Sequence, residues 1–136
     1  SWRLEDLKPL YVIECERIAV MAEAMAGCVA IVREYEANRQ ARRPASWLVE
    51  EGRLLDAAPA RLTNLLARFD NLFAMIEDHR EHYLIPHILR EMSLLRRFIA
   101  DLRASLETVA EQAKAGTITT LPELGVLKIQ RVKFPD

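Results

Sequence analysis

The stretch LTNLLARFDNLFAMI, residues 62–76, carries the clearest structural signal in the chain. Its apolar residues recur at steps of three and four, the spacing that places side chains on one face of an α-helix. An isolated helix of this length is marginally stable in water, so the apolar face has to be buried against other helices. The stretch therefore predicts an inner helix of an all-α bundle, whose core-facing side chains are Leu62, Leu65, Leu66, Phe69, Leu72, Phe73 and Ile76.

A helix of the same kind is predicted after Pro86, which interrupts or kinks the helix before it. Its apolar positions keep helical spacing until Gly116, a natural C-terminal stop because glycine adopts a left-handed backbone without strain. The inner face of this helix is predicted to consist of Leu89, Met92, Leu95, Ile99, Leu102, Leu106 and Val109.

The N-terminal part predicts one long helix and one short helix. The long helix begins between Asp6 and Pro9 and fades in the polar, basic segment 36–46. Ser46 is expected to cap a short helix over residues 46–58, which ends before Pro59 because the residue preceding a proline avoids helical geometry. The long helix is predicted to carry one broad apolar stripe, formed by Leu10, Ile13, Ile18, Met21, Met25, Val29 and Val32.

The C-terminal segment has a different character from the helices. GVLKIQRVKF, residues 125–134, alternates apolar and polar side chains as an edge strand does, or as an arm that lies on a partner. The predicted fold is an up-and-down helical bundle of three long helices plus one short helix over residues 1–116. An extended C-terminal arm is predicted over residues 117–136.

The composition bounds the classes of protein. The 136 residues suffice for one domain, and a net charge of -1 does not suggest a protein coated in nucleic acid, although it leaves room for a local basic patch. The basic residues that could guide a nucleic acid, or simply form a solvated face, are Arg39, Arg42, Arg43, Arg96, Arg97, Lys128, Arg131 and Lys133. No apolar run approaches the roughly 20 residues that span a bilayer, so no membrane partner is expected. Cys15 and Cys28 lie too far apart along one helix to form a disulfide, and free thiols suggest a reducing cytoplasm.

The window DHREHYLIPH, residues 78–87, contains all three histidines of the chain. Steps of three and four from Ile76 place Arg80 and His87 on the continuation of the apolar face, where a guanidinium is costly unless it is paired or lines a cleft. In one interpretation the window is ordinary surface. Arg80 then pairs with a carboxylate such as Glu77, His87 begins the next helix, and the other two histidines face solvent.

A second interpretation is a metal site. Asp78 and His82 are four residues apart and His79 and His82 three apart, so either pair could face one ion. Metal sites in helical bundles draw their ligands from facing helices, and here no other helix offers a histidine. The sequence therefore predicts neither a metal nor a cofactor.

A third interpretation rests on Arg80 and His87, separated by six residues, and on the run Arg80-Glu81-His82-Tyr83-Leu84. This pattern resembles the signature of the HEPN superfamily, and in particular its abortive-infection branch. The resemblance implies a small four-helix protein that cleaves RNA without a metal, often at a site shared between two subunits. Glu81 and Pro86 depart from the family pattern, and both are compatible with a member that only binds RNA.

The chemistry of RNA cleavage suits these residue types. Histidine can move the proton of the 2′-hydroxyl, and arginine binds phosphate oxygens with two parallel hydrogen bonds. His87 is the predicted general base or acid, Arg80 the phosphate-binding cation and His82 a second acid–base group. Tyr83, together with Glu81 and His79, completes the predicted binding residues.

Two functions follow as hypotheses. The first is a HEPN-like ribonuclease or an RNA- or nucleotide-binding module of a toxin or phage-defence system, acting as a homodimer and paired with an antitoxin or another protein. The alternative is a non-enzymatic helical-bundle protein that docks a partner or a second copy through its C-terminal arm.

Overall fold

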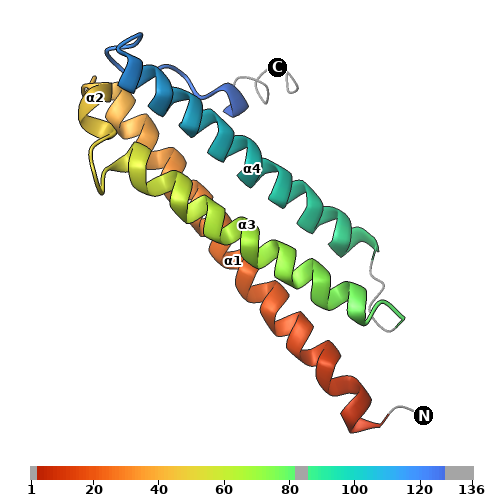
Figure 1. Ribbon diagram of the computed structural model, residues 1–136. Coiled ribbons are helices and arrows are strands. Elements are labelled where there is room, and N and C mark those ends of the chain that lie inside the picture. Colours follow the sequence, from red (N-terminus) through yellow and green to blue (C-terminus); the bar gives the residue numbers. More distant parts are fainter. Residues whose placement is uncertain (1–2, 82–85, 128–136) are drawn as a thin grey trace.

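The computed structural model describes residues 3–81 and 86–127. The helices are α1 (Leu4–Gln40), α2 (Ala45–Leu48), α3 (Leu54–Asp78) and α4 (Pro86–Ala115). The three long helices lie along one another, with α3 antiparallel to both α1 and α4, and the short α2 sits at one end (Figure 1). The predicted up-and-down bundle of three long helices and one short helix is confirmed. None of the helices in the described part of the chain is both long and apolar enough to cross a membrane.

The core lies between α3 and its two long neighbours. Leu62, Phe69 and Leu72 of α3 have no exposed surface, as the spacing of their helix predicted. Opposite them, α4 buries Met92, Ile99, Leu102 and Leu106 just as completely. Every fully buried side chain among the described residues is apolar or aromatic, so burial of apolar surface is the main force that holds the bundle together.

The apolar residues of α1 do not form the single stripe that the sequence predicted. The side of the helix that meets the core carries Ile13, Val20, Ala24, Cys28, Ile31 and Tyr35, and we call these residues the inner face. Three members of the predicted stripe lie elsewhere, because Ile18 is 56% exposed, Met25 57% and Val29 49%. At 3.6 residues per turn these three point about 120° away from the inner face. α1 therefore carries apolar residues on two nearly opposite sides.

The boundary between the second and third helices also differs from the prediction. The segment expected as one helix over 46–58 is divided by a turn in which Gly52 has a positive φ of 77°, and α3 begins at Leu54. Pro59 lies inside α3, near its start. A proline this close to the N-terminus of a long helix removes only one backbone hydrogen bond, so it does not stop the helix. Pro44, not Ser46, occupies the N-cap position of α2.

The chain after α4 folds back onto the bundle. Gly116 ends α4 with a φ of 73°, and the backbone N–H of Ala45 donates a hydrogen bond of 2.9 Å to the carbonyl of Thr119. The Tyr35 hydroxyl donates to the carbonyl of Pro122 at 2.5 Å. Residues 125–127 form a helical turn instead of the predicted strand, and the rest of that strand, 128–134, lies outside the described residues. This segment buries Leu121, Leu124 and Val126 against its own bundle.

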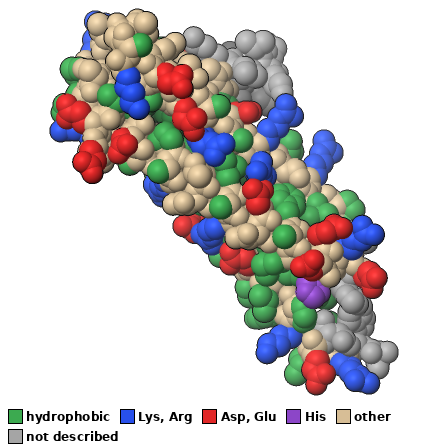
Figure 2. All heavy atoms as spheres, viewed as in Figure 1, with side chains coloured by type: hydrophobic (Ala, Val, Ile, Leu, Met, Phe, Trp, Pro, Cys, Tyr) green, Lys and Arg blue, Asp and Glu red, His purple; other side chains and the backbone are tan. Residues whose placement is uncertain are grey.

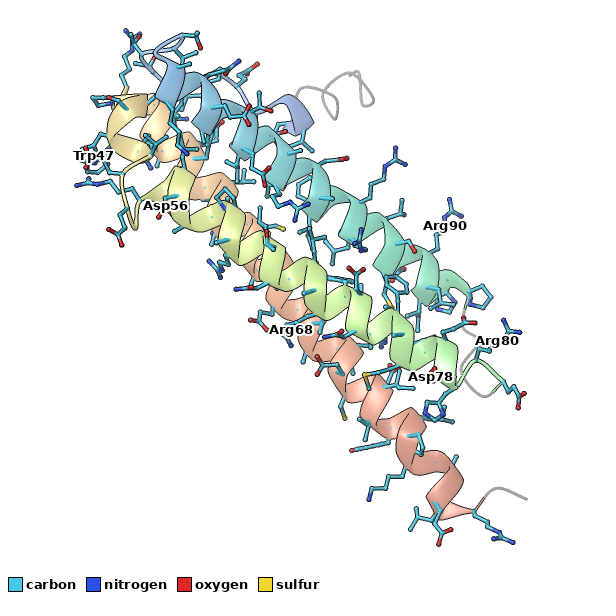
Figure 3. All side chains as sticks on the ribbon, in the orientation of Figure 1. Trp47, Asp56, Arg68, Asp78, Arg80 and Arg90 are labelled. Atoms are coloured by element: carbon cyan, nitrogen blue, oxygen red, sulfur yellow. The ribbon has the colours of Figure 1, made fainter. Side chains whose placement is uncertain are left out.

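Two arginines connect neighbouring long helices at the bundle surface. Arg68 projects from α3 to α1, where it pairs with Glu23 and, at 3.4 Å, with Glu16 (Figure 3). Arg96 of α4 donates two hydrogen bonds, 2.8 and 3.1 Å long, to the two carboxylate oxygens of Asp70 in α3. These pairs join α1 and α4 to α3 at the surface of the bundle, while apolar burial holds the helices together.

Candidate functional site

The histidine window begins where α3 ends. Asp78 is the last residue of α3, and His79 leaves helical geometry with a φ of -124° while its N–H still donates to the carbonyl of Ile76 at 3.1 Å. Arg80 follows in a turn. The expectation that Arg80 and His87 continue the core-facing stripe of a single helix is therefore wrong, because the helix stops before it reaches either residue.

Arg80 lies at the surface. Its Nη1 is 3.3 Å from Oε1 of Glu77, and the two side chains are 69% and 70% exposed. Figure 3 shows Arg80 beyond the end of α3, directed away from the bundle. Glu77 is the partner that the surface interpretation named for Arg80, and the pairing removes the need for a cleft around the guanidinium.

The other predicted site residues are distributed around the same connection. His87 is exposed in the first turn of α4, directly after Pro86, and Glu81 is exposed in the turn after α3. His82 and Tyr83 lie outside the described residues. Neither Arg80 nor His87 is buried in a shared pocket, so their catalytic role stays a prediction.

His79 is the one half-buried side chain of the window among the residues that the structure describes. It borders a hollow of about 370 Å³ between the end of α3 and the first turns of α1. The charged residues around this hollow are Asp78, Glu5 and Lys8. A phosphate would meet two carboxylates and one ammonium group there, which makes the hollow a poor anion site.

The arrangement of the described side chains gives little support to a metal site or to a nucleic-acid surface. Within residues 3–81 and 86–127, no group of three or more His, Cys, Asp or Glu side chains is placed to hold an ion. Arg39 is paired with Glu36 at 3.2 Å, and Arg43 lies over the Trp47 ring with its Cζ 5.5 Å from the ring centroid. Arg96 is paired with Asp70, so three of the predicted cations are engaged with their own chain, whereas Arg42 and Arg97 are exposed and the cations of the tail lie outside the described residues.

The uncovered side of α1 is the largest feature that the sequence interpretation missed. Eight uncharged residues follow one another along it at steps of three and four, the spacing of one face of a helix. All eight are exposed, and the large ones extensively so, from 41% for Leu7 to 84% for Leu4. We call this set the outer face: Leu4, Leu7, Tyr11, Cys15, Ile18, Ala22, Met25 and Val29.

The outer face continues into hollows beside it. One hollow of about 520 Å³ lies over the first turns of α1 and is lined by Leu4, Leu7 and Tyr11 together with the stems of two charged residues. A groove of about 740 Å³ runs between α1 and α3, from Tyr11 and Cys15 across to Leu72 and Met75. Figure 2 shows hydrophobic side chains gathered toward the end of the molecule where α1 emerges beside α3. A surface of this kind binds by burying apolar area.

The two cysteines lie on opposite sides of α1. Cys15 belongs to the outer face and is exposed, whereas Cys28 belongs to the inner face and is 5% exposed. Burial raises the pKa of the Cys28 thiol, and the nearby Arg61 guanidinium opposes this shift only in part. Cys28 is therefore a packed core thiol, and Cys15 is a native chemical probe in the middle of the outer face.

No model of a known protein family, no characterised protein and no solved structure matches this chain. The function is therefore inferred from the geometry of its surface.

Proposed function

We propose that the protein is a non-enzymatic interaction module whose binding surface is the outer face of α1. One observation carries the proposal: six large apolar side chains lie along one side of a helix and are each at least 41% exposed. The members of this set are Leu4, Leu7, Tyr11, Ile18, Met25 and Val29. Single exposed apolar residues are ordinary on protein surfaces, but a continuous row of them marks a contact with another surface.

The bundle supports the part of this row from Cys15 to Val29. Over that length the inner face of α1 is buried, and Arg68 of α3 pairs with Glu16 and Glu23. Binding to this part therefore requires little ordering of the backbone, and little of the gain from apolar burial is lost to entropy. Each Å² of apolar area removed from water contributes about 25 cal/mol, so a row of this length can support a specific complex.

The proposal moves the binding surface away from the C-terminal arm, where the sequence had suggested it. In the described part of that arm, Leu121, Leu124 and Val126 are buried against the protein's own bundle. They are consequently occupied within the chain, whereas the apolar side chains of the outer face are accessible.

The test is site-specific photo-crosslinking in the cells that produce the protein. A photoreactive amino acid that replaces Ile18 is expected to form a covalent adduct with another protein. The control carries the same photoreactive amino acid in place of Asp101, an exposed residue of α4. Adducts that form at Ile18 and not at Asp101 support the module. Equal labelling at both positions, or no adduct at Ile18, would overturn it.

We infer a second function from the exposure of the histidine window. Arg80 and His87 are both exposed, on either side of the short connection between α3 and α4, where a polymer as large as RNA could reach them. This accessibility supports the HEPN-like ribonuclease or RNA-binding module, with RNA as substrate and an antitoxin or a second copy as partner. Loss of RNA cleavage in both Arg80→Ala and His87→Ala would support it, and unchanged cleavage in both would exclude the catalytic assignment.

A further inference from the structure

We propose that the partner of the outer face is a second copy of this chain, packed antiparallel against the first about a two-fold axis. The axis passes close to the midpoint of the outer face, between Glu16 and Arg17. The inference rests on the proposed interaction function and adds to it the identity and the orientation of the partner.

The spacing of the outer face is symmetric about that midpoint. Positions 4 and 29, 11 and 22, and 15 and 18 are all centred between residues 16 and 17, and positions 7 and 25 are centred half a residue away. In an antiparallel pair related by a two-fold axis, position i of one helix faces the position equally far from the centre in the other. Every position of the outer face therefore meets another position of the outer face.

The facing side chains are complementary in size. Tyr11, 74% exposed and the largest side chain of the row, faces Ala22, the smallest. The hollow of about 520 Å³ between Leu4 and Tyr11 faces the partner's Met25 and Val29, and methionine adapts its shape to such a hollow. Because Tyr11 is set against Ala22, the largest side chain of the row does not keep the two helices apart.

The charges around the face do not oppose a second copy. Arg17, near the midpoint of the row, lies on the inner side of α1 and pairs there with Glu14, so it stays outside the contact. None of the eight positions of the face is charged, so association leaves no charge buried without a partner. Both signs flank the face, at Glu5 and Lys8 for example, which does not fit an anionic membrane surface.

The size of the contact lies close to the lower limit for a specific dimer. From Leu4 to Val29 the face is about 38 Å long, and one helix diameter, about 10 Å, wide. In projection this is roughly 400 Å² on each copy. The accessible area of a surface covered with side chains exceeds its projection, so two copies together approach the roughly 1,200 Å² at which specific interfaces begin.

The first test is the oligomeric state of the purified full chain. Sedimentation equilibrium is expected to show a dimer that Ile18→Glu converts to monomer, because the substitution sets two carboxylates beside each other near the axis. Leu94→Glu on α4 is the matched control, since Leu94 and Ile18 are both 56% exposed. A monomeric wild type at about 100 μM, or equal weakening by the two substitutions, would overturn the inference.

The second test is the orientation of the two helices. In a Cys15→Ser background, chains with Leu4→Cys are mixed with chains with Val29→Cys and treated with a short thiol-specific crosslinker. The antiparallel pair predicts crosslinks between the two kinds of chain. If Leu4→Cys chains crosslink only to one another and not to Val29→Cys chains, the two helices are parallel and the proposed symmetry is overturned.

The inference and the proposed function fail in different ways. If the purified protein is monomeric while the photoreactive residue at Ile18 captures a different protein in cells, the interaction module stands and the homodimer is excluded. If Ile18 captures nothing in cells and the purified protein is monomeric, both proposals fall.

Discussion

The inner and outer faces of α1 are built from the same kinds of side chain and differ in what covers them. Each face carries a cysteine, a tyrosine and β-branched aliphatic residues. Ile31 and Tyr35 on the inner face are 3% and 0% exposed, whereas Ile18 and Tyr11 on the outer face are 56% and 74% exposed. Helical periodicity thus locates an apolar face without saying whether the same chain buries it. The outer face is the apolar part of α1 that stays exposed to solvent after the single chain has folded.

The largest difference between the faces is expected in stability. Ile31→Ala should lower the free energy of unfolding by about 2–4 kcal/mol, because it leaves a cavity in the core. Val29→Ala, two residues away on the outer face and 49% exposed, should change it by less than about 0.5 kcal/mol in the monomer. Urea unfolding of both variants, in protein dilute enough to be monomeric, measures the two values. Equal losses would show that the chain itself covers the outer face.

The two cysteines allow a chemical comparison of the faces. With an aromatic disulfide reagent at pH 8, Cys15 is expected to react at least about 100-fold faster than Cys28. Cys28 is buried and its thiol pKa is raised by burial, so its reactive thiolate is both rare and inaccessible. Cys15→Ser should remove the fast phase and leave the slow one.

Denaturant provides the control for the thiol experiment. In fully unfolded protein both thiols should react at similar rates, because burial no longer separates them. Slow labelling of Cys15 that speeds up on dilution would show that self-association covers the outer face.

Much of the fold follows from the sequence, and the reasons why parts of it do not are physical. The spacing of Phe69, Leu72 and Ile76 in α3 identified core positions because a helix packed between two others has one apolar side. The same reasoning failed for α1, where residues of two opposite faces were merged into one stripe. Pro59 was predicted to end a helix, but a proline near the start of a helix removes few hydrogen bonds.

The candidate site was less predictable than the fold. Arg80 was placed on the inner side of α3 by extending a period that stops at Asp78, two residues earlier. The exact end of a helix depends on local capping, which periodicity does not report. The outer face could have been found from the steps between Leu4, Leu7 and Tyr11, which precede the first buried residue of α1, Ile13.

The two tyrosines of α1 give a smaller contrast. Tyr35→Phe should cost about 1 kcal/mol, since it removes the hydrogen bond to the Pro122 carbonyl, and Tyr11→Phe should cost nothing in the monomer. Burial, with a smaller contribution from Glu36, raises the pKa of Tyr35 above its ordinary value near 10.

The raised pKa gives the Tyr35 comparison a pH dependence. The unfolded chain ionises its tyrosine near pH 10, and the folded chain does so only at higher pH, so the contribution of Tyr35 is complete below pH 10 and is lost above it. The stability difference between wild type and Tyr35→Phe should therefore shrink as pH rises from 9 to 11. Urea unfolding of both proteins at each pH measures this difference. A difference that stays constant from pH 9 to 11 would show that the Tyr35 hydroxyl has the same pKa in the folded and unfolded chains.

The smallest effect is expected at Arg80, which belongs to neither face. Arg80→Ala should change the free energy of unfolding by less than about 0.5 kcal/mol, because the pair with Glu77 is exposed on both sides and screened by solvent. The labelling rate of Cys15 should not change either. Glu77→Ala is the matched control, and a double-mutant cycle measures the coupling directly. Stability and the outer face are expected to be intact in Arg80→Ala, so any loss of RNA cleavage or RNA binding in this variant would be assigned to the guanidinium itself. A loss of stability larger than the predicted limit would instead show that the exposed Arg80 side chain has a structural role.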